Sequence, residues 1–175
     1  MVVVITLIAI ISAMSVPIIK DFGDAVALGQ AQRLVQTELQ QARMKAVTSN
    51  RNVRVRFNCP AAGQFRTVEL IGTPTFPAAQ DTAANRCSET VYPYPADNNA
   101  LTLPNQDGPV RRIDTRVTFG ATQTIEFRPT GLAYAVNADG TSNVVLGGNG
   151  AAITVTKSGT VKTVTVNALG KISAQ

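Results

Sequence analysis

The chain opens with nineteen residues that carry no charged side chain, MVVVITLIAIISAMSVPII, before the first one at Lys20. A surface helix of a soluble protein would normally have a polar face, and this segment has none. At 1.5 Å per residue, a helix from Met1 to Ile19 would be about 28 Å long, close to the hydrocarbon thickness of a bilayer. The segment therefore predicts a membrane-embedded helix, and it constrains the fold more than any other feature.

A cleaved signal peptide fits this segment less well than a retained helix does. A signal peptide has a basic region before its apolar run and a small-residue cleavage site after it. Here the apolar run begins at Met1, and the only candidate cleavage site, SAMS, is a poor one. We therefore expect the helix to remain in the mature protein. No basic residue precedes it, so the positive-inside rule does not define its orientation.

The helix is expected to continue without a linker, but its pattern changes at about residue 22. Apolar residues now recur at helical spacing with polar residues between them, which predicts an amphipathic helix that lies on a sheet. These apolar residues are Leu28, Ala31, Val35, Leu39, Ala42 and Ala46. Pro17 and Gly23 are expected to kink the helix. Ser49 and Asn50 are expected to end it.

The chain after the helix predicts a β-domain. Val53, Val55 and Phe57 alternate with Arg54 and Arg56, which is typical of a half-buried strand. The two arginines are expected to face solvent or a neighbouring subunit. The segment FRTVEL should return as the second strand of a hairpin, with its apolar residues buried. Further strands are expected at residues 116–119, 124–129, 132–136, 142–147, 151–157 and 161–167, separated by turn sequences.

These patterns divide the chain into three regions. Residues 1–21 are the membrane-embedded half of the helix, residues 22–50 are its amphipathic half, and residues 51–175 are the β-domain. Within the β-domain, residues 73–109 are rich in Pro, Ala, Asn and Asp and lack periodicity, so they predict a long loop. The predicted fold class is α+β, with one long N-terminal helix packed on a C-terminal antiparallel β-domain.

The chain has two cysteines, Cys59 and Cys87, and both lie in turn-like sequence. If the domain lies beyond an inner membrane, a disulfide bond between them is the simplest interpretation. It would close a loop of about 29 residues, worth on the order of 3 kcal/mol by chain entropy, and would hold the long loop down. The alternative is two free thiols in a cytosolic protein.

The residue inventory argues against an enzyme. The sequence has no histidine, which excludes Ser–His and Cys–His nucleophiles and histidine metal sites. Neither of the common phosphate-binding glycine motifs is present, and the GGNG of residues 147–150 is expected to be a hairpin turn. Asp81, Asp97 and Asp107 lie in the long loop and could meet a Ca²⁺ ion, although solvated carboxylates are far more common. We expect no catalytic residue, resident metal or cofactor.

The N-terminal segment resembles the first helix of type IV pilins and type II secretion pseudopilins. In those helices the apolar stretch ends in small-x-small-x-Pro, and Ala13, Ser15 and Pro17 match that pattern. With Pro17 aligned, Met1 falls just after the family's glutamate. We therefore expect the prepilin leader and the first mature residues to be missing from this sequence, through a late start codon or a fragment.

The segment LVQTELQQARMKAVTSNRNVRVRF resembles the GspH/FimT subgroup of that class. Its helix ends in leu-x-x-ala-arg-x-x-ala-x-x-x-asn-arg-x-val, and the matching residues here are Leu39, Ala42, Arg43, Ala46, Asn50, Arg51 and Val53. Residues 125–133 resemble the subgroup's itF-x-x-x-G hairpin. Residues 164–172 resemble its closing strand and Gly-Arg turn, with Lys171 in place of the arginine. The resemblance covers most of the chain except residues 73–109.

The resemblance implies a minor pilin or pseudopilin, a filament subunit rather than an enzyme. Such a protein is held as a single-pass protein in the bacterial inner membrane with its β-domain in the periplasm. A prepilin peptidase cleaves and N-methylates it, and an inner-membrane assembly platform adds it to a filament of other pilins. Close helix packing there would involve small residues and a local break. The expected packing residues are Ala9, Ser12, Ala13, Ser15 and Pro17.

Several functions remain open within this class. Initiation or capping of a type IV pilus is our first expectation, and the matching pseudopilin of a type II secretion system is the second. A membrane-anchored β-domain without a filament role is a further alternative.

DNA binding in natural transformation is an alternative from another class. Some members of the FimT side bind DNA through a basic region around the Gly-Arg turn, and this chain has a net charge of +5. The candidate contacts are Arg111, Arg112, Arg116, Lys157, Lys162 and Lys171. No aromatic residues lie among them, and no second basic residue follows Lys171, so a basic filament surface is favoured over DNA binding. Arg43 is expected to form an ion pair or to bind carbonyls at the helix end.

Overall fold

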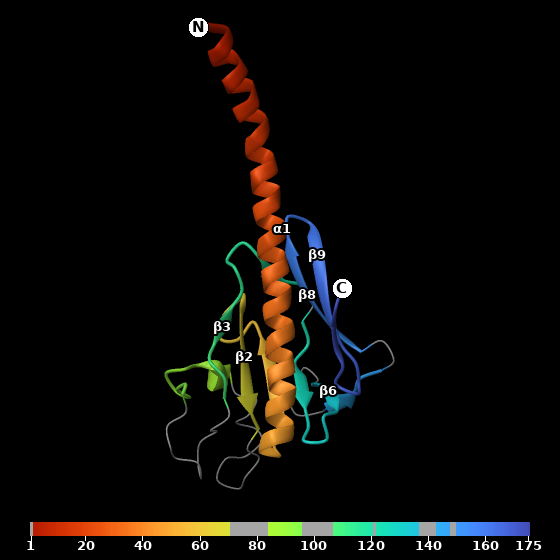
Figure 1. The fold of residues 1–175 in the computed structure, drawn as a ribbon. Coiled ribbons are helices and arrows are strands. Elements are labelled where there is room, and N and C mark those ends of the chain that lie inside the picture. Colours follow the sequence, from red (N-terminus) through yellow and green to blue (C-terminus); the bar gives the residue numbers. More distant parts are fainter. Residues whose placement is uncertain (1, 71–83, 96–106, 121, 137–142, 148–149) are drawn as a thin grey trace.

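The computed structural model describes residues 2–70, 84–95, 107–120, 122–136, 143–147 and 150–175. For residues 2, 7–19, 84, 85 and 143 it describes the backbone only. Figure 1 shows one long helix whose C-terminal half lies against a β-domain, while its N-terminal half extends beyond that domain. The architecture is α+β, as predicted.

The helix, α1 (Val2–Ser49), is continuous over 48 residues and passes through Pro17 and Gly23 without a break. Its N-terminal part leans away from the axis of the rest (Figure 1). Asn50 ends it in a left-handed conformation, with φ of 54°. The amide of Arg51 then donates to the carbonyl of Ala46 at 3.3 Å, which is the closing bond of a Schellman motif. The predicted end of the helix is therefore confirmed, and asparagine suits it because it tolerates a positive φ.

Two antiparallel sheets make up the β-domain. The first has the strand order β3-β2-β1-β5-β6-β7 and the second has the order β10-β9-β8-β4. The strands of the first sheet are β1 (Val53–Phe57), β2 (Gln64–Glu69), β3 (Arg111–Arg112), β5 (Ile125–Phe127), β6 (Ala133–Val136) and β7 (Asn143–Val145). Those of the second are β4 (Thr118–Phe119), β8 (Ala151–Lys157), β9 (Thr160–Val166) and β10 (Ile172–Ala174).

The predicted hairpin is confirmed, since β1 pairs with β2 in the register that runs from Val53↔Glu69 to Phe57↔Phe65. The six later strands expected from the sequence appear as β4 to β9, several of them shorter than predicted. The sequence analysis did not identify β3, β10 or the short 3₁₀ helix η1 (Ala84–Cys87). The prediction of a hairpin turn at residues 147–150 is wrong. The amide of Gly150 does donate to the carbonyl of Gly147, but the strands on either side, β7 and β8, belong to different sheets.

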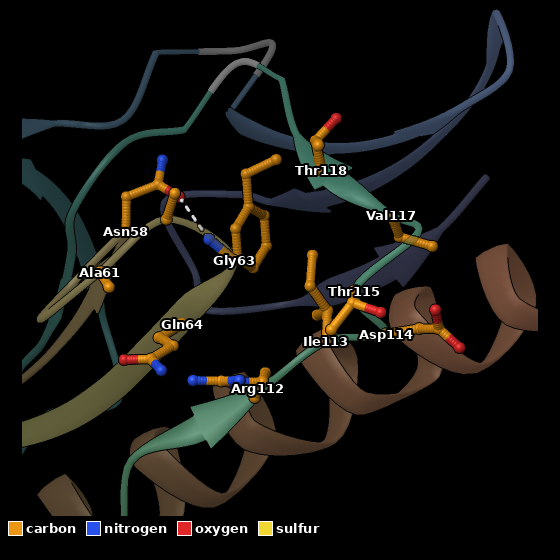
Figure 2. Close-up of a pocket in the computed structure, with 12 residues that line it drawn as sticks. Asn58, Ala61, Gly63, Gln64, Arg112, Ile113, Asp114, Thr115, Val117 and Thr118 are labelled. Atoms are coloured by element: carbon orange, nitrogen blue, oxygen red, sulfur yellow. Dashed lines mark hydrogen bonds between the residues drawn. The ribbon is translucent and has the colours of Figure 1, made fainter.

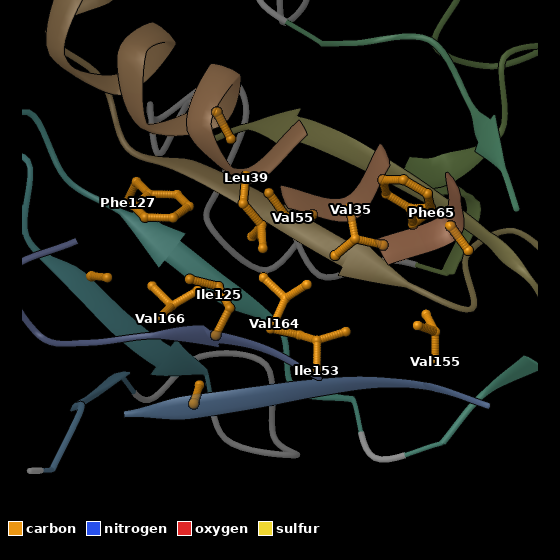
Figure 3. Packing of buried hydrophobic residues seen from close by; sticks show 14 of the residues in the cluster. Val35, Leu39, Val55, Phe65, Ile125, Phe127, Ile153, Val155, Val164 and Val166 are labelled. Carbon is orange, nitrogen blue, oxygen red and sulfur yellow. The ribbon is translucent and has the colours of Figure 1, made fainter. Parts of the chain in front are cut away.

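The core lies between α1 and the two sheets (Figure 3). The apolar face predicted for the helix is confirmed, because each of its six residues is at most 3% exposed. These residues are Leu28, Ala31, Val35, Leu39, Ala42 and Ala46. They pack against inward-facing side chains of both sheets, including Val55, Ile125 and Ile153. One helix thus holds both sheets together through apolar burial, the main favourable term in folding.

Candidate functional site

The face of β1 and β2 that points away from α1 carries charged side chains. Residues alternate between the faces of a strand, so Arg54 and Arg56 lie opposite the buried Val53 and Val55. In the register of the sheet, Arg56 is paired with Arg66 of β2. The prediction that Arg54 faces solvent or another subunit is wrong, because only 6% of it is exposed and its Nε donates to Glu126 at 2.8 Å. Burial lowers the pKa of Arg56 and, to a lesser degree, so does the charge of Arg54.

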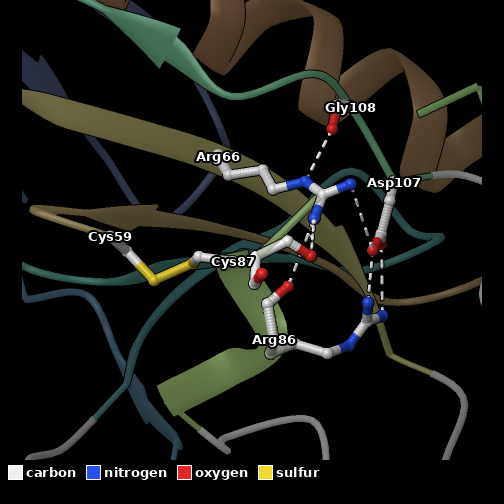
Figure 4. The surroundings of a disulfide bond; sticks show 7 residues. Cys59, Arg66, Arg86, Cys87, Asp107 and Gly108 are labelled. Atoms are coloured by element: carbon white, nitrogen blue, oxygen red, sulfur yellow. Dashed lines mark hydrogen bonds and ion pairs between the residues drawn. A yellow bond between two sulfur atoms is a disulfide. The ribbon is translucent and has the colours of Figure 1, made fainter. Parts of the chain in front are cut away.

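Irregular segments of the chain cover this charged face of the sheet, and Arg66 lies at the centre of their contacts with it (Figure 4). It is fully buried, and its guanidinium donates to the carbonyls of Gly108 and Tyr92, both at 2.7 Å. Longer contacts of 3.4 Å reach the carbonyls of Arg86 and Ser88. Burial lowers the pKa of Arg66, and Asp107 opposes that shift. One side chain of β2 therefore binds the backbone of two segments, residues 86–92 and 107–108, which have little regular structure of their own.

Arg86 and Asp107 add a buried ion pair to the same cluster. The Arg86 guanidinium donates to both carboxylate oxygens of Asp107 and to the carbonyl of Glu69. Asp107 in turn accepts the amide of Glu69 at 2.7 Å. Burial raises the pKa of Asp107, and the charge of Arg86 acts in the opposite direction. The expectation that Asp107 is a solvated loop carboxylate or a Ca²⁺ ligand is therefore wrong. The other two candidates, Asp81 and Asp97, lie outside the described residues.

A disulfide bond between Cys59 and Cys87 borders this cluster, as predicted (Figure 4). Their Cα atoms are 5.6 Å apart, and the bond joins the turn after β1 to the end of η1. Cys87 follows Arg86 directly, so the covalent link and the buried ion pair hold the same short helix. We refer to Arg66, Arg86, Asp107 and the two cysteines as the polar clamp.

Arg43 brings together the segments that carry the family resemblance. Its Nε donates to the carbonyl of Gly131 at 3.2 Å, and its Nη2 donates to the carbonyl of Leu169 at 3.1 Å. Gly170 has a φ of 71°, and a Cβ there would collide with the carbonyl of Gly131 and with Arg43 itself. The expectation that Arg43 forms an ion pair or binds carbonyls at the helix end is wrong, because the carbonyls that it binds belong to two turns far away in the sequence.

The six cations proposed as DNA contacts do not form one uniformly basic surface. Arg111 is paired with Glu38 at 2.7 Å, and Lys157 is 3.6 Å from Asp24. Arg116 is paired with Asp114 at 2.9 Å and lies 3.8 Å from Asp24. Hydrogen bonds from Arg116 lower the pKa of Asp114 to about 2. Of these six candidates, Arg112, Lys162 and Lys171 have no ion-pair partner among the residues that the structure describes.

A shallow groove of about 530 Å³ lies beside β3, next to the turn between β1 and β2 (Figure 2). Asn58, Gln64, Arg112 and Asp114 line it together with apolar and hydroxyl side chains. The only cation in its wall is Arg112, and the groove has no cysteine or glutamate. Across all described residues, no three of His, Cys, Asp and Glu gather in a way that could hold a metal ion.

Parts of the helix surface face outward. Phe22 and Met44 are among the exposed large apolar side chains of the molecule, together with Val26 and Val47. The predicted packing residues Ala9, Ser12, Ala13, Ser15 and Pro17 belong to α1, but their side chains lie outside the described ones. In the described portion of the chain, no helix is long and apolar enough to cross a membrane.

Comparison with known proteins gives a family match and a fold match. The family model described as type II transport protein GspH matches residues 30–170. No curated protein matches the chain significantly.

Two solved structures illustrate the fold match. A crystal structure of the type IV minor pilin FimU from Pseudomonas aeruginosa aligns with a TM-score of 0.50 and 11% identity, over 88% of this chain and 92% of that chain. The minor pseudopilin EpsH of the type 2 secretion system of Vibrio cholerae aligns with a TM-score of 0.46 and 10% identity, over 85% of this chain and 95% of that chain. At 11% identity, the match to FimU describes the fold alone.

Proposed function

Since the chain belongs to the GspH family of type II transport proteins, we propose that it is a non-enzymatic minor pilin that initiates or caps a type IV pilus. The observation that carries this proposal is the division of α1. Its C-terminal half is buried against both sheets, whereas its N-terminal half extends beyond them (Figure 1). Val3, Val4 and Ile5 in the extended half are exposed apolar residues. Such a segment needs an apolar environment, which a membrane or a bundle of similar helices supplies.

The N-terminal half of α1 would lie first in a membrane and later in a bundle of helices. The N-terminal half first anchors the protein in the bacterial inner membrane, with the β-domain in the periplasm. A prepilin peptidase processes it and an assembly platform extracts it. The helix then exchanges lipid for the helices of other pilins, and small residues such as Ala13 and Ser15 allow the backbones to approach closely.

A pseudopilin role in type II secretion is the second candidate, because the matching family description names type II transport. Both roles use the same helix and β-domain, so genomic neighbours and phenotype distinguish them. Pilus assembly genes beside this gene favour the first role, and secretion genes favour the second.

DNA binding is a weaker candidate. Carboxylates neutralise Arg111, Arg116 and Lys157, which reduces the positive surface available to phosphates. Gel shifts of the full chain at two salt concentrations test this candidate. Absence of a shift at low salt would remove it.

The test of the main proposal is deletion of the gene followed by complementation. We expect the deletion to reduce surface pili at least tenfold in sheared fractions, and the unaltered chain to restore them. Ala13→Leu with Ser15→Leu should fail to restore pili, because the larger side chains keep the helices apart. The matched control, Ile10→Leu with Ile11→Leu, changes two apolar residues without changing their bulk and should restore them.

Two results would contradict the proposal. Full piliation in the deletion strain would remove the initiating role. Loss of secretion in a deletion strain with normal pili would support the pseudopilin role in type II secretion instead.

A further inference from the structure

The groove beside β3 is lined by the terminal strands of both sheets. Among the described strands, β3 ends the six-stranded sheet, and its Arg112 lines the groove (Figure 2). β4 ends the other sheet in the same way, and its two residues, Thr118 and Phe119, line the groove as well. A strand that ends a sheet has unpaired backbone groups on one side, and these form a template for a further strand. We call this hollow the edge groove.

The unpaired side of β4 is defined by its pairing with β8. In that register Gly120 lies opposite Thr154, and its amide donates to the carbonyl of Thr154 at 3.0 Å. Opposite residues of an antiparallel pair alternate between those that exchange hydrogen bonds and those that do not. The amide and carbonyl of Phe119 therefore point away from β8, and no described residue forms a hydrogen bond with them. They are available to a strand that enters the edge groove.

Much of the wall of the edge groove is apolar. The ring of Phe119 packs against the rings of Phe57 and Phe65, with centroids 5.3 and 5.8 Å apart. A residue that an added strand places opposite Phe119 has its side chain on the same face of the sheet. An apolar side chain at that position would extend the aromatic cluster. The other apolar residues of the wall are Ala61, Ala62, Ile113 and Val117.

The edge groove also carries a positive charge that no described carboxylate neutralises. This charge is that of Arg112, which is exposed and lies beside the uncharged side-chain amide of Gln64. Asp114 lines the groove too, but Arg116 donates two hydrogen bonds to its carboxylate, at 3.0 and 2.9 Å. The edge groove is therefore complementary to an apolar segment that carries a carboxylate.

We propose that the edge groove binds an extended segment of a different pilin, which adds a strand to β4. One residue of the segment exchanges hydrogen bonds with the backbone of Phe119, and a carboxylate of the segment pairs with Arg112. The proposal rests on the proposed filament function and names the surface through which this chain holds a neighbour. A partner with another sequence suits an initiating or capping subunit, because the contact is made once and does not repeat.

The size of the edge groove limits the length of the bound segment. A volume of about 530 Å³ is that of a sphere about 10 Å across, which is the length of about three residues of an extended chain. The carboxylate and the apolar side chain of the partner should therefore lie within about three positions of each other. This spacing is a property that the sequence of a cross-linked partner can be checked for.

Photo-cross-linking in cells tests the contact. The deletion strain expresses the full chain with benzoylphenylalanine in place of Ala61, an exposed residue of the edge groove. Irradiation should give an adduct that mass spectrometry locates in another pilin, in a segment with the expected spacing. The same replacement at Thr115, on the other side of the groove, should give the same adduct (Figure 2). The matched control at Val161, an exposed residue of β9 outside the groove, should not give it.

A charge exchange tests the ion pair separately. In the cross-linking background, Arg112→Glu should reduce the adduct at least fivefold, because it places a carboxylate against that of the partner. An arginine in place of the partner's carboxylate should restore the adduct, since the opposite charges are re-created in reverse. Lys171→Glu reverses another exposed cation that lies outside the edge groove, and it should leave the adduct unchanged.

A synthetic copy of the cross-linked segment tests the added strand. An N-methyl group is placed on one backbone amide at a time, and the Kd for the full chain in detergent is measured by fluorescence anisotropy. Methylation should raise the Kd at least fivefold at alternate residues and less than twofold at the residues between them. The reason is that only every second amide of an added strand points toward β4.

Four results would overturn the proposal: no adduct at Ala61 or Thr115, an adduct with a second copy of this chain, an adduct that Arg112→Glu leaves unchanged, or methylation effects that do not alternate. The sheared-filament assay separates these outcomes from failure of the proposed function. A variant that restores pili without giving the adduct keeps the function and removes this contact. An adduct with another pilin in a strain whose deletion leaves piliation intact keeps the contact and removes the initiating role.

Discussion

The two faces of the six-stranded sheet are covered in different ways. On the helix side, apolar residues at regular spacing on α1 meet apolar residues of the strands, and the contact is continuous. On the other side, Arg66 and its partners hold two irregular segments by individual hydrogen bonds, next to a disulfide bond. The stability of the contact on the helix side depends on buried apolar area, and that of the contact on the other side depends on a few specific hydrogen-bonding atoms.

The difference matters because the two kinds of contact fail differently. An apolar contact weakens in proportion to the atoms removed and the cavity left. A buried ion pair that loses one partner leaves a charge that neither water nor another group compensates, so a small chemical change has a large cost. We therefore expect the polar clamp to be more sensitive than the core to substitutions that preserve size.

The largest expected effect is in the core. Phe127→Ala should lower the free energy of unfolding by about 4 kcal/mol, because Phe127 is fully buried against α1. Denaturant titration of the full chain in detergent measures the loss. Val144→Ala, at an exposed position of β7, is the control and should change the value by less than about 0.5 kcal/mol. Similar losses for the two variants would contradict the assigned core.

In the polar clamp, Asp107→Asn should cost about 3 kcal/mol although the side chain hardly changes in size. The substitution removes the negative charge opposite Arg86 and Arg66 but preserves the shape of the side chain. The comparison in the core is Ile125→Val, which removes one methylene group and should cost only about 1 kcal/mol. An Asp107→Asn loss no larger than that of Ile125→Val would show that the clamp is no more sensitive than the core.

A double substitution sharpens this comparison. Arg86→Met with Asp107→Leu removes both charges of the short ion pair, so the loss should be smaller than the sum of the two single losses. Additive losses would indicate that the two side chains act independently.

Removal of the disulfide should have a somewhat smaller effect, about 2–3 kcal/mol for Cys59→Ser with Cys87→Ser, because the unfolded chain regains the freedom of the closed loop. Limited proteolysis should then detect cleavage within residues 84–95, while the segment around Leu39 stays protected by the core. Equal cleavage within residues 84–95 and around Leu39 would contradict the view that the polar clamp and the apolar core hold the sheet independently.

The smallest effect concerns the surface pair of Asp114 and Arg116. The pKa of Asp114 is lowered to about 2 by hydrogen bonds from Arg116, from an ordinary value of 3.8. A lowered folded-state pKa stabilises the fold above the ordinary value, and the contribution disappears as the pH falls through about 2. The unfolding midpoints of the unaltered chain and Asp114→Asn should therefore differ slightly and constantly above pH 5, then converge toward pH 2. A difference that persists at pH 2 would disprove this assignment.

Much of the fold could be predicted because it depends on periodic patterns. The spacing of Leu28, Val35 and Leu39 predicted the buried helix face, and the alternation around Val53 predicted β1 and its hairpin partner. The resemblance also identified Arg43 and the two glycine turns. Their convergence on one point could not be read from the chain, because it depends on how the chain folds between Arg43 and Leu169, which are 126 positions apart.

The burial of the charged residues in and around the polar clamp could not be predicted from sequence patterns. Arg54 and Asp107 look like ordinary exposed charges in the sequence, and Arg66 lies in a strand that was judged only by its apolar residues. Nothing local to these residues indicates burial, because the segments that cover them are irregular and distant in sequence. Their partners became known only from the structure.

The sequence by itself therefore determined the elements of this protein: a long helix with two unlike halves, a β-domain and a family. These follow from period, composition and motif, which are properties of short stretches. Only the tertiary structure decided which charges are buried, which turns Arg43 binds, and which apolar and charged side chains remain on the surface. The physical reason is that burial and pairing depend on distances between residues far apart in the chain, and those distances exist only after folding.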